Sequence, residues 1–565
     1  MTATAHFAFW PEGRPHSLDA PERNVFENLD GSATRCPDKA GLVFYGNEIS
    51  FARMKDEAER LAGFLQRECG VEAGGRVLLF LQNSPQFVVA YYAILRANAV
   101  VVPVSSMSVT DELRHYLADS GATVAIVGQE LYPQLRPLLG SEGSGLRHAV
   151  VAAYSDYLAQ PTGLPEGLPV PDVIRAQRQE LSDAAATAWN AALARGLRPG
   201  PLTAGPDDLA VMPYTSGTTA RPKGCMHTHR SVMHTVVANV RWFETDRDAV
   251  LLAVLPFFHV TGMQGSMNSP IFNSSTVVLL PRWDRSAAAR MIERHKVTAW
   301  TCVPTMAVDF LSNPKLADYD LSSIVHMSGG GAAMPEAIAT RLQQLCGITY
   351  IEGYGLSETM APTHINPPHR PKKNCLGIPI FDVDARVVDP DTLNELPVDA
   401  VGEIVLSGPQ VFRGYWNNPQ ATSAAFFERD GKRFFRTGDL GRVDAEGYFF
   451  MVDRLKRMIN CAGMKVWPAE VEAVLYHHPS AREVCVIAVR DEYRGETVKA
   501  VVVLREEARG KVSAEEFIEW SRPRMAAYKV PRQVEFVEAL PKSATGKINW
   551  RSLQEREREK ESPVR

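Results

Sequence analysis

The sequence lacks the features that define several classes of protein. No apolar run approaches the roughly 18 residues that a membrane span needs. The chain does not begin with a basic segment followed by an apolar one, so a secretory signal is not expected. The formal net charge of −4 gives no general attraction to nucleic acid. None of the eight cysteines belongs to a CxxC pair, which argues against a zinc site or a disulfide framework. We therefore expect reduced thiols and a cytoplasmic protein.

What is present is the composition of a globular protein. The 565 residues are 45% hydrophobic and 22% charged, which is typical of a chain that folds around buried cores. This length exceeds that of an ordinary single domain. It predicts about three or four domains, or one large domain together with a small one.

The order of the apolar segments predicts an α/β fold. Strand-like runs occupy residues 76–81, 99–104 and 123–128, and helical patterns lie between them. Ser84 and Thr110 are placed to cap the two helices. This alternation of strand and helix argues for parallel sheets that are covered by helices.

Two regions depart from this alternation. Residues 160–205 are rich in proline, glycine and alanine, and we interpret them as a surface excursion with one helix near Val173–Arg195. Residues 384–416 contain shorter segments, which indicate a small β-rich subdomain. After Arg457, about a hundred residues mix short strands with helices.

Several later strand-like segments run directly into unusual loops. These loops are "FFHVTG" (Phe257–Gly262), "SGGGAA" (Ser328–Ala333) and "GYGLSE" (Gly353–Glu358). In open parallel sheets, ligands bind outside the carboxyl ends of the strands. The three loops therefore predict one shared crevice.

The segment "TSGTTARPKG" (Thr215–Gly224) has the composition of a phosphate-binding loop. Its glycines and threonines would let backbone N–H groups converge on an anion, and Lys223 adds a compact positive charge. It does not match the Walker A pattern. A solvated turn would have a similar composition, so both interpretations stay open at this point.

Three other segments carry side chains suited to a nucleotide. Glu358, beside Ser357 in "GYGLSE", suits a magnesium ion carried on a polyphosphate, although a helix start would look similar. Asp439 in "FRTGD" could accept hydrogen bonds from a diol with Arg454 nearby, although such residues usually form ordinary charge pairs. Lys547 follows a glycine turn in "PKSATGK", where a solvated lysine is the simpler interpretation.

Taken together and in this order, these segments resemble the signature motifs of the acyl-adenylate-forming enzymes. That family includes acyl-CoA synthetases, peptide-synthetase adenylation domains and luciferases. The resemblance covers nearly the whole chain, and "MKVWPAEVE" and "YKVP" are most similar to the fatty acyl-CoA synthetase branch. It implies that ATP and a carboxylate form acyl-AMP and pyrophosphate, and that coenzyme A then attacks the acyl-AMP. ATP, Mg²⁺ and coenzyme A are thus the implied cofactors and co-substrates.

The resemblance also implies a set of ATP-binding residues. Thr215–Gly224 would enclose the β- and γ-phosphates, and adenine would lie between Tyr354 and the backbone of residues 329–332. The full set is Thr215, Ser216, Gly217, Thr218, Thr219, Lys223, Gly329, Gly330, Gly331, Ala332, Glu352, Gly353, Tyr354, Gly355, Ser357, Asp439, Arg454 and Lys547.

Within this set, the family assigns distinct tasks to individual side chains. Ser357 would meet the α-phosphate, and Glu358 would hold magnesium. Asp439 would take the ribose hydroxyls, with Arg454 beside it. Lys547 would bridge the carboxylate and the α-phosphate during attack. The implied catalytic residues are Thr215, His259, Glu358 and Lys547.

The acyl side of the site is expected around "PFFHVTG". His259 stands where amino-acid-activating members carry an aspartate, which argues against an amino acid substrate. Apolar residues near this histidine would suit an alkyl chain, so a medium- or long-chain fatty acid is expected. A stripe of apolar residues at helical spacing is, however, more often simple core. The implied acyl-pocket residues are His259, Val260, Met263, Val236, Val237 and Gly331.

The resemblance implies motion between the two half-reactions. It places an N-terminal adenylating domain over residues 1–455 and a small mobile α+β domain over residues 456–565. Lys456 would be the hinge, and Gly463 and Lys465 would line the coenzyme A channel. Two departures from the family pattern are Ala220 in the phosphate loop and Arg457, a cation that could meet coenzyme A phosphates.

Several alternatives stay open at the level of sequence. The acceptor could be a carrier protein, the acid could be aromatic or short, or the chain could bind acyl groups without turnover. A homodimer is the expected assembly, no nucleic-acid partner is expected, and peripheral membrane contact is left open.

Replacing Lys547 with alanine should slow adenylate formation by on the order of 100- to 1000-fold, the usual cost of losing one transition-state charge partner. ATP affinity should barely change, because the phosphate loop and Glu358 remain. Pyrophosphate release and equilibrium ATP binding would measure the two quantities. Near-normal pyrophosphate release in the variant would remove Lys547 from the mechanism.

Overall fold

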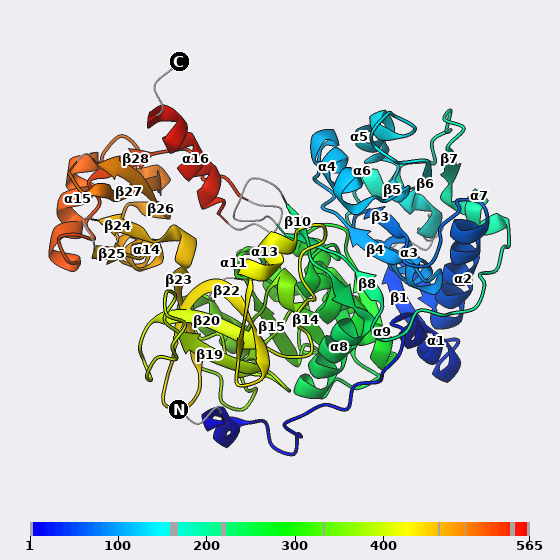
Figure 1. Cartoon of the computed structure of the whole chain (residues 1–565), viewed down its shortest axis with the longest axis horizontal. Helices are drawn as coiled ribbons and strands as arrows, with labels where there is room; N and C mark the ends of the chain where they lie inside the picture. Colours follow the sequence, from blue (N-terminus) through cyan, green and yellow to red (C-terminus); the bar gives the residue numbers. More distant parts are fainter. Residues whose placement is uncertain are drawn as a thin grey trace. The chain divides into compact units, whose positions relative to one another are not determined.

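The computed structural model (Figure 1) describes residues 4–158, 168–215, 222–331, 334–461, 464–491, 493–542 and 548–561. No helix within these ranges is both long and apolar enough to cross a membrane. The chain divides into two compact units, which are described separately. The large unit comprises His6–Asp384 and Leu406–Phe435, and the small unit comprises Met1–Ala5, Ala385–Val405 and Arg436–Arg565.

The first sheet of the large unit has seven strands, and most of them are parallel. The runs predicted at 76–81, 99–104 and 123–128 are confirmed as its central strands, with β3 between β4 and β5. The order is β11 (His227–Thr228), β8 (Leu209–Val211), β4 (Val100–Pro103), β3 (Arg76–Phe80), β5 (Val124–Gly128), β6 (His148–Ala152) and β7 (Ala186–Ala188).

One of the two predicted helix caps is confirmed. Helix α3 (Pro85–Arg96) begins after Ser84, whose hydroxyl accepts a hydrogen bond from the N–H of Phe87 at 3.2 Å. The prediction for Thr110 was wrong by one position, because α4 (Thr110–Ser120) already includes it. The Thr110 hydroxyl donates instead to the carbonyl of Gln134 at 2.9 Å, so a tertiary contact takes the group that was expected to cap the helix.

The single helix predicted near Val173–Arg195 was also wrong. Two short helices, α6 (Asp172–Arg175) and α7 (Trp189–Ala194), are separated by extended chain and by β7. The side chain of Gln129 donates to the carbonyl of Gln177 at 3.1 Å and accepts from the N–H of Gln179 at 3.2 Å. These backbone groups are therefore paired outside any helix.

The second sheet has nine strands and carries the loops of interest. Its neighbours β12, β14, β15 and β16 run parallel, so the loops that follow them leave the same edge. The order is β18 (Ile378–Pro379), β17 (His364–Ile365), β16 (Tyr350–Tyr354), β15 (His326–Gly330), β14 (Ala299–Thr301), β12 (Val250–Ala253), β13 (Thr276–Leu279), β1 (Ala40–Phe44) and β2 (Asn47–Ser50).

Helix α3 links the two sheets through one continuous core. All of its residues from Pro85 to Leu95 are buried, and the core cluster that contains Phe87 to Leu95 also contains side chains of β3 and β12. At the end of β3, the Asn83 amide donates to the carbonyl of Leu255 and accepts from the N–H of Phe257, both at 2.8 Å. A side chain from the first sheet thus fixes the start of the "FFHVTG" loop on the second.

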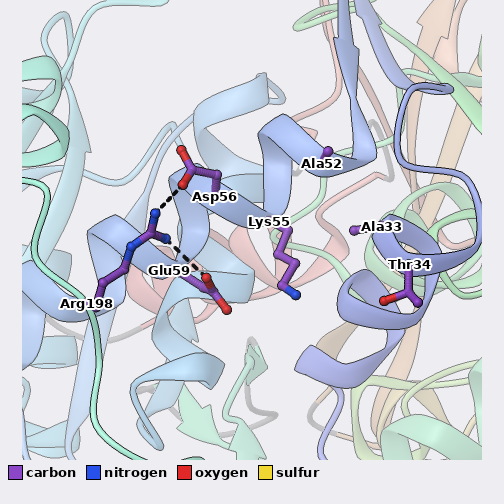
Figure 2. Close-up of a pocket in the computed structure, with 7 residues that line it drawn as sticks. All are labelled: Ala33, Thr34, Ala52, Lys55, Asp56, Glu59 and Arg198. Carbon is purple, nitrogen blue, oxygen red and sulfur yellow. Dashed lines mark hydrogen bonds and ion pairs between the residues drawn. The ribbon is translucent and has the colours of Figure 1, made fainter.

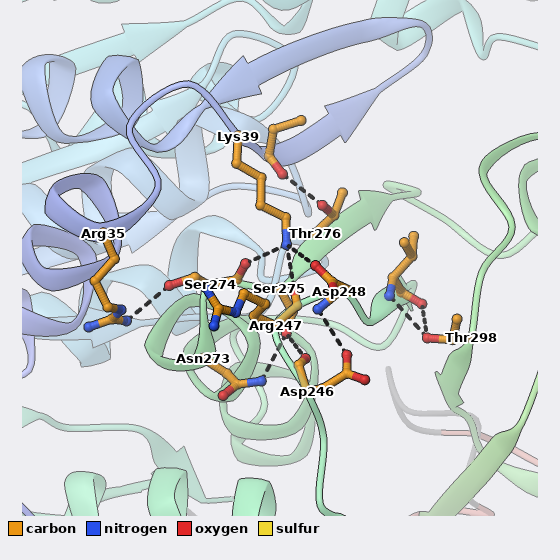
Figure 3. A network of polar contacts seen from close by, with 12 residues as sticks. Arg35, Lys39, Asp246, Arg247, Asp248, Asn273, Ser274, Ser275, Thr276 and Thr298 are labelled. Carbon is orange, nitrogen blue, oxygen red and sulfur yellow. Dashed lines mark hydrogen bonds and ion pairs between the residues drawn. The ribbon is translucent and has the colours of Figure 1, made fainter.

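A polar network closes the opposite edge of the second sheet (Figure 3). The Lys39 ammonium donates to the carbonyl of Ser274 at 2.9 Å and also to that of Arg247. The Thr276 hydroxyl donates to the carbonyl of Ala40 at 2.8 Å. The carbonyls of Arg247 and Ser274 lie just before the amino ends of β12 and β13. Through Lys39, the network therefore connects the segment that precedes β1 to both of these strands.

The remaining helices of the large unit cover its sheets or connect their strands. Among them, α1 and α2 contact one another, and α8 and α9 both contact the π-helical turn at Gly262–Asn268. Their bounds are α1 (Phe26–Arg35), α2 (Phe51–Arg67), α5 (Tyr132–Leu135), α8 (His229–Phe243), α9 (Ser269–Asn273), α10 (Arg285–His295), α11 (Pro304–Leu311), α12 (Glu336–Cys346) and α13 (Pro419–Ala424).

The predicted β-rich region is confirmed as a five-stranded sheet. Its longest strand, β22, pairs through Phe434 and Phe435 with β21 and through Asp439 to Val443 with β23. The strands are β19 (Asp384–Val388), β20 (Gly402–Ser407), β21 (Phe426–Arg429), β22 (Lys432–Val443) and β23 (Phe449–Arg454).

The C-terminal part of the small unit mixes strands and helices, as predicted. A hairpin of β26 and β27, with Val486 opposite Ala500, forms its centre. The elements are β24 (Ile459–Cys461), β25 (Met464–Val466), β26 (Ala481–Asp491), β27 (Gly495–Leu504), β28 (Gln533–Phe536), α14 (Pro468–Leu475), α15 (Ala514–Ser521) and α16 (Trp550–Glu561).

One buried cation ties the last helix to this centre. The Lys499 ammonium on β27 lies 2.7 Å from a carboxylate oxygen of Glu535 on β28 and 2.8 Å from one of Glu557 on α16. The side chains of Lys499 and Glu557 are only 8% and 11% exposed. Because α16 follows the segment that contains Lys547, this network fixes the chain just beyond that lysine.

Replacing Lys39 with methionine should lower the free energy of unfolding by about 1–3 kcal/mol, because it removes a charged donor from the partly buried bond to Ser274 and from the bond to Arg247. Urea and thermal unfolding of the full chain would measure the change. Lys296→Met is the matched control, since its exposed ammonium pairs with Asp320 at 2.8 Å, and such pairs contribute about 0.2–1 kcal/mol. Equal losses in the two variants would contradict the importance of the network in Figure 3.

Candidate active site

The described ends of the phosphate loop face each other across a short ladder. Thr215 ends β9 (Tyr214–Thr215), Lys223 begins β10 (Lys223–Gly224), and the two residues are paired antiparallel. The predicted phosphate ligands between them, and Ala220, lie outside the described residues; these ligands are Ser216, Gly217, Thr218 and Thr219. The structure thus brings together Thr215 and Lys223, the two predicted ligands that it describes.

The stem of this loop is anchored on both sides. The hydroxyl of Tyr214 donates to the carboxylate of Asp119 at 2.6 Å, and His115 bonds through Nε2 to the carbonyl of Pro222 at 2.9 Å. The indole of Trp416 donates to the carbonyl of Asp119 at 2.9 Å. These contacts fix the positions from which Thr215 and Lys223 extend.

A residue that the sequence analysis did not identify joins two of the predicted ligands. The ammonium of Lys223 lies 4.8 Å from the centre of the Tyr415 ring, and the Tyr415 hydroxyl donates to Oε1 of Glu358 at 2.9 Å. Burial and the Glu358 charge raise the pKa of Tyr415, so the phenol remains a donor at neutral pH. The local sequence "RGYW" is typical of a turn and does not indicate this role. The position of Tyr415 follows from its long-range pairing with Cys225.

Glu358 lies in a single turn of 3-10 helix, Ser357–Thr359, just beyond β16. His227 of β11 lies behind this turn, with Nε2 2.7 Å from the carbonyl oxygen of Ser357. Burial lowers the pKa of His227 to about 4, with the Ser357 carbonyl opposing the shift, so the ring is neutral at pH 7 and donates through Nε2. A hydrogen bond from a neutral histidine therefore holds the backbone of Ser357 in place.

Packing and backbone conformation together require glycine at residues 329–331, which are predicted to face adenine. A Cβ on Gly329 would lie 1.8 Å from the carbonyl oxygen of Cys302, and one on Gly330 would lie 2.2 Å from that of Gly353. Gly331 has φ +85°, a conformation that favours glycine. Tight packing between neighbouring strands thus leaves this backbone bare, and Ala332 lies outside the described residues.

The predicted residues on β16 have different surroundings. Tyr354 ends the strand, with its ring 5.6 Å from that of His364. The carboxylate of buried Glu352 accepts hydrogen bonds from the N–H groups of Met334 at 2.6 Å and Cys375 at 3.1 Å. Burial raises the pKa of Glu352, and these two bonds oppose the rise. Glu352 thus holds two loops in place.

The two remaining glycines here, Gly353 and Gly355, also have close neighbours. Gly353 pairs with Ile365 of β17, and a Cβ on Gly355 would lie 2.8 Å from the Cα of Ala361. Their place in the ATP site stays a prediction.

Apart from Gly331, the predicted acyl residues lie on the turn after β12 and on α8, and α8 and the π-helical turn Gly262–Asn268 contact each other. His259 accepts a hydrogen bond at Nδ1 from the N–H of Thr261 at 3.3 Å, and its carbonyl accepts from Met263 at 2.9 Å. Met263 is a buried residue of the π-helical turn Gly262–Asn268. The apolar members Val236, Val237, Val260 and Met263 all belong to the same buried core.

The residues predicted for ribose lie in the small unit. Asp439 on β22 and Arg454 on β23 stand opposite each other, and their side chains form an ion pair at 2.9 Å. Asp439 is 1% exposed, and the Arg454 side chain is 45% exposed. The ion pair agrees with the alternative interpretation from the sequence, an ordinary charge pair. It also holds the Asp439 carboxylate in one orientation.

The predicted hinge, Lys456, lies in a 3-10 turn at Leu455–Arg457. Arg457 does not extend toward solvent: its guanidinium contacts Glu472, donates to the carbonyl of Val486 at 3.1 Å and lies 3.8 Å from Asp453. Its side chain is 13% exposed. The hypothesis that Arg457 meets coenzyme A phosphates is therefore corrected, because neighbouring acids already occupy this cation.

Other predicted residues of the small unit are described only in part. Lys465 lies in β25, opposite Asn460 of β24. Gly463 and Lys547 lie outside the described residues. Their roles in the coenzyme A channel and in catalysis stay predictions.

The structure also has a surface pocket (Figure 2), whose lining residues come from other parts of the sequence than the predicted site residues. Its lining comes from α1, α2 and Arg198, and contains none of the predicted site residues. The charges pair internally, since the Arg198 guanidinium contacts Asp56 at 2.5 Å and Glu59 at 3.1 Å. We do not assign the chemistry to this pocket.

The described residues contain no cluster of three or more histidine, cysteine or acidic side chains that could hold a metal ion. Glu358 instead offers one carboxylate whose Oε1 is already oriented by Tyr415. Magnesium bound to nucleotides usually takes one or two carboxylates together with phosphate oxygens and water. The donor set therefore fits magnesium delivered on a polyphosphate.

Comparison with known proteins decides the family. The model for AMP-binding enzymes matches residues 29–416, and that for the AMP-binding enzyme C-terminal domain matches residues 470–547. The chain belongs to the AMP-binding enzyme family. The resemblance stated from its motifs is thereby confirmed.

Individual members of this family match along almost the whole chain. A long-chain-fatty-acid–CoA ligase of Bacillus subtilis is 36% identical over 563 residues, which cover 98% of each chain. A feruloyl-CoA synthase of Amycolatopsis is 34% identical and covers 91% of this chain and 95% of its own. The crystal structure of ATP-bound MatB from Rhodopseudomonas palustris superposes with a TM-score of 0.80 at 26% identity, covering 94% of this chain and 98% of MatB.

Arg457→Met should destabilise the small unit, because it leaves the largely buried acids Asp453 and Glu472 without their cation. The loss expected for breaking such a pair is about 3–5 kcal/mol. Urea unfolding and limited proteolysis of the full chain would measure it. The double variant Arg457→Met/Glu472→Gln removes both charges and keeps an acceptor for the N–H of Val486. Partial recovery in the double variant is expected, because Asp453 keeps its charge without Arg457, and a fully stable single variant would contradict the role of the pair.

Proposed function

We propose that this AMP-binding enzyme is an acid–thiol ligase that converts a medium- or long-chain fatty acid into its coenzyme A thioester. ATP is consumed, and AMP and pyrophosphate are released. The observation that carries the proposal is the convergence of Lys223 and Glu358 on Tyr415, at the end of the loop stem that Thr215 shares. A cation and a carboxylate held this way suit the two needs of a magnesium-bound triphosphate.

In the first half-reaction, a carboxylate oxygen of the acid attacks the α-phosphorus of ATP. The bond from that phosphorus to the oxygen bridging the β-phosphate breaks, and pyrophosphate leaves. Thr215, its neighbours in the loop and Lys223 bind the β- and γ-phosphates, and Lys547 stabilises charge at the α-phosphate. No side-chain base is needed, because the attacking carboxylate is already ionised.

In the second half-reaction, the thiol sulfur of coenzyme A attacks the acyl carbonyl of the acyl-AMP. The thioester bond forms, the bond from the acyl carbon to the AMP oxygen breaks, and AMP leaves. Lys456 is the proposed hinge between the two steps, and Gly463 and Lys465 line the thiol channel. This assignment rests on the resemblance of the motifs, since the C-terminal family model matches residues 470–547, which follow all three positions.

The proposed acid is supported by the named activity of the Bacillus subtilis relative and by the buried apolar side chains beside His259. An aromatic acid is the second candidate, because a feruloyl-CoA synthase is 34% identical to this chain. The two candidates share the chemistry and differ only in the group that Val236, Val260 and Met263 enclose.

Magnesium is the proposed metal, with Glu358 as its protein ligand; bound to ATP, it would neutralise charge on the phosphates. A cytoplasmic location is supported by the eight cysteines, all within the described residues and none joined in a disulfide. A homodimer is proposed from the resemblance alone.

Pyrophosphate release across a panel of carboxylic acids, with and without coenzyme A, tests the function. We expect a stoichiometric burst with fatty acids when coenzyme A is absent, and continuous turnover with AMP formation when it is present. Amino acids should give no release, because His259 replaces the aspartate that would bind their amine. A preference for hydroxycinnamic acids would establish the second candidate, and release with no acid of the panel would overturn the proposal.

A further inference from the structure

We propose that Tyr415 is a positioning residue that sets Glu358 and Lys223 in register for one magnesium-bound triphosphate. The inference rests on the proposed function, since it concerns the same site. It assigns a task to a side chain that touches neither reacting atom. The phenol would orient the carboxylate, and the ring would hold the ammonium.

The two contacts come from different parts of the same side chain. The hydroxyl donates to Oε1 of Glu358 at 2.9 Å, and the ring lies 4.8 Å below the ammonium of Lys223. A phenol has a single proton to donate, so this bond fixes the position of one carboxylate oxygen of Glu358. An ammonium over an aromatic face is attracted by the ring quadrupole. One rigid group therefore separates the two charges at a set spacing.

The backbone around Tyr415 fixes the ring itself. Tyr415 forms an antiparallel bridge with Cys225, two residues beyond Lys223. The N–H of Trp416 donates to the carbonyl of Gly224, and the N–H of Phe412 donates to that of Glu358, both at 2.8 Å. The strand-like segment 412–416 is thus bonded to the loop stem on one side and to the turn of Glu358 on the other.

This arrangement explains how two elements far apart in the sequence keep a common geometry. Lys223 lies between β8 and β11 of the first sheet, and Glu358 follows β16 of the second. Groups that hold a metal-binding carboxylate by a hydrogen bond typically change metal affinity by about 10- to 100-fold when removed. A cation on a ring contributes less, about 0.5–1 kcal/mol at an exposed site. The phenol and the ring should therefore have separable effects.

Tyr415→Phe keeps the ring and removes the hydroxyl, so it isolates the contact with Glu358. Calorimetric binding of ATP to the full chain, with Mg²⁺ or with EDTA, is the readout independent of turnover. We expect ATP affinity in EDTA to stay within about twofold, and affinity with Mg²⁺ to fall by about tenfold. The Mg²⁺ concentration for half-maximal pyrophosphate release should rise, with kcat at saturating Mg²⁺ little changed.

Tyr415→Leu removes the ring as well. It should additionally weaken ATP binding in EDTA by about two- to fivefold, through the loss of support for Lys223. Tyr132→Phe is the matched control, because its phenol donates to the carboxylate of Asp183 at 2.8 Å in a part of the chain that carries no site residue. It should change neither affinity.

A double-mutant cycle separates positioning from a general loss of structure. In a Glu358→Gln background, Tyr415→Phe should cause no further loss of the Mg²⁺-dependent affinity, because its route through the carboxylate is gone. Additive losses would overturn the inference, as would wild-type Mg²⁺ dependence in folded Tyr415→Phe. Failure of the proposed function is distinguishable, since the wild-type protein would then neither bind ATP nor release pyrophosphate, and the role of Tyr415 would fall with it.

Discussion

The parallel alignment of β12, β14, β15 and β16 is the constraint on which the large unit depends. It brings the loop of His259, the bare glycine backbone and the turn of Glu358 to one edge of one sheet. Two long-range contacts then attach segments next to the first sheet to that edge. Asn83 holds the start of the "FFHVTG" loop, and segment 412–416 bonds the phosphate-loop stem to the turn of Glu358. These bonds join backbone to backbone or to a short amide side chain, so no long side chain is needed to hold the edge together.

Much of this arrangement could be predicted from the sequence, because the signals are local. The runs at 76–81, 99–104 and 123–128 show strand periodicity, and Ser84 followed by proline is a local helix start. The predictions failed where a distant partner decides the outcome. The Thr110 hydroxyl is bonded to Gln134, and backbone groups around Gln177 are bonded to the side chain of Gln129. Distant partners, and not local propensity, therefore decide both structures.

The candidate site shows the same division. Thr215, Lys223 and Glu358 stand in recognisable motifs, and the structure places them on one connected framework through Tyr415. Tyr415 itself could not be found, because its partner Cys225 is far away in the chain and no spacing rule links them. Arg457 was visible as a departure from the family pattern, but its burial depends on Glu472 and Val486, which only the folded small unit brings near.

The buried pairing of Arg457 also limits how this chain can recombine with its relatives. Its charge is matched by Asp453 before the hinge turn and by Glu472 in α14 after it. A crossover between these positions would join a cation from one parent to a pocket that evolved around another residue. Chimeras should therefore inherit the stretch from Asp453 to Val486 as one block. A boundary placed at Lys456, the predicted hinge, would cut through this set of interior charges within the small unit.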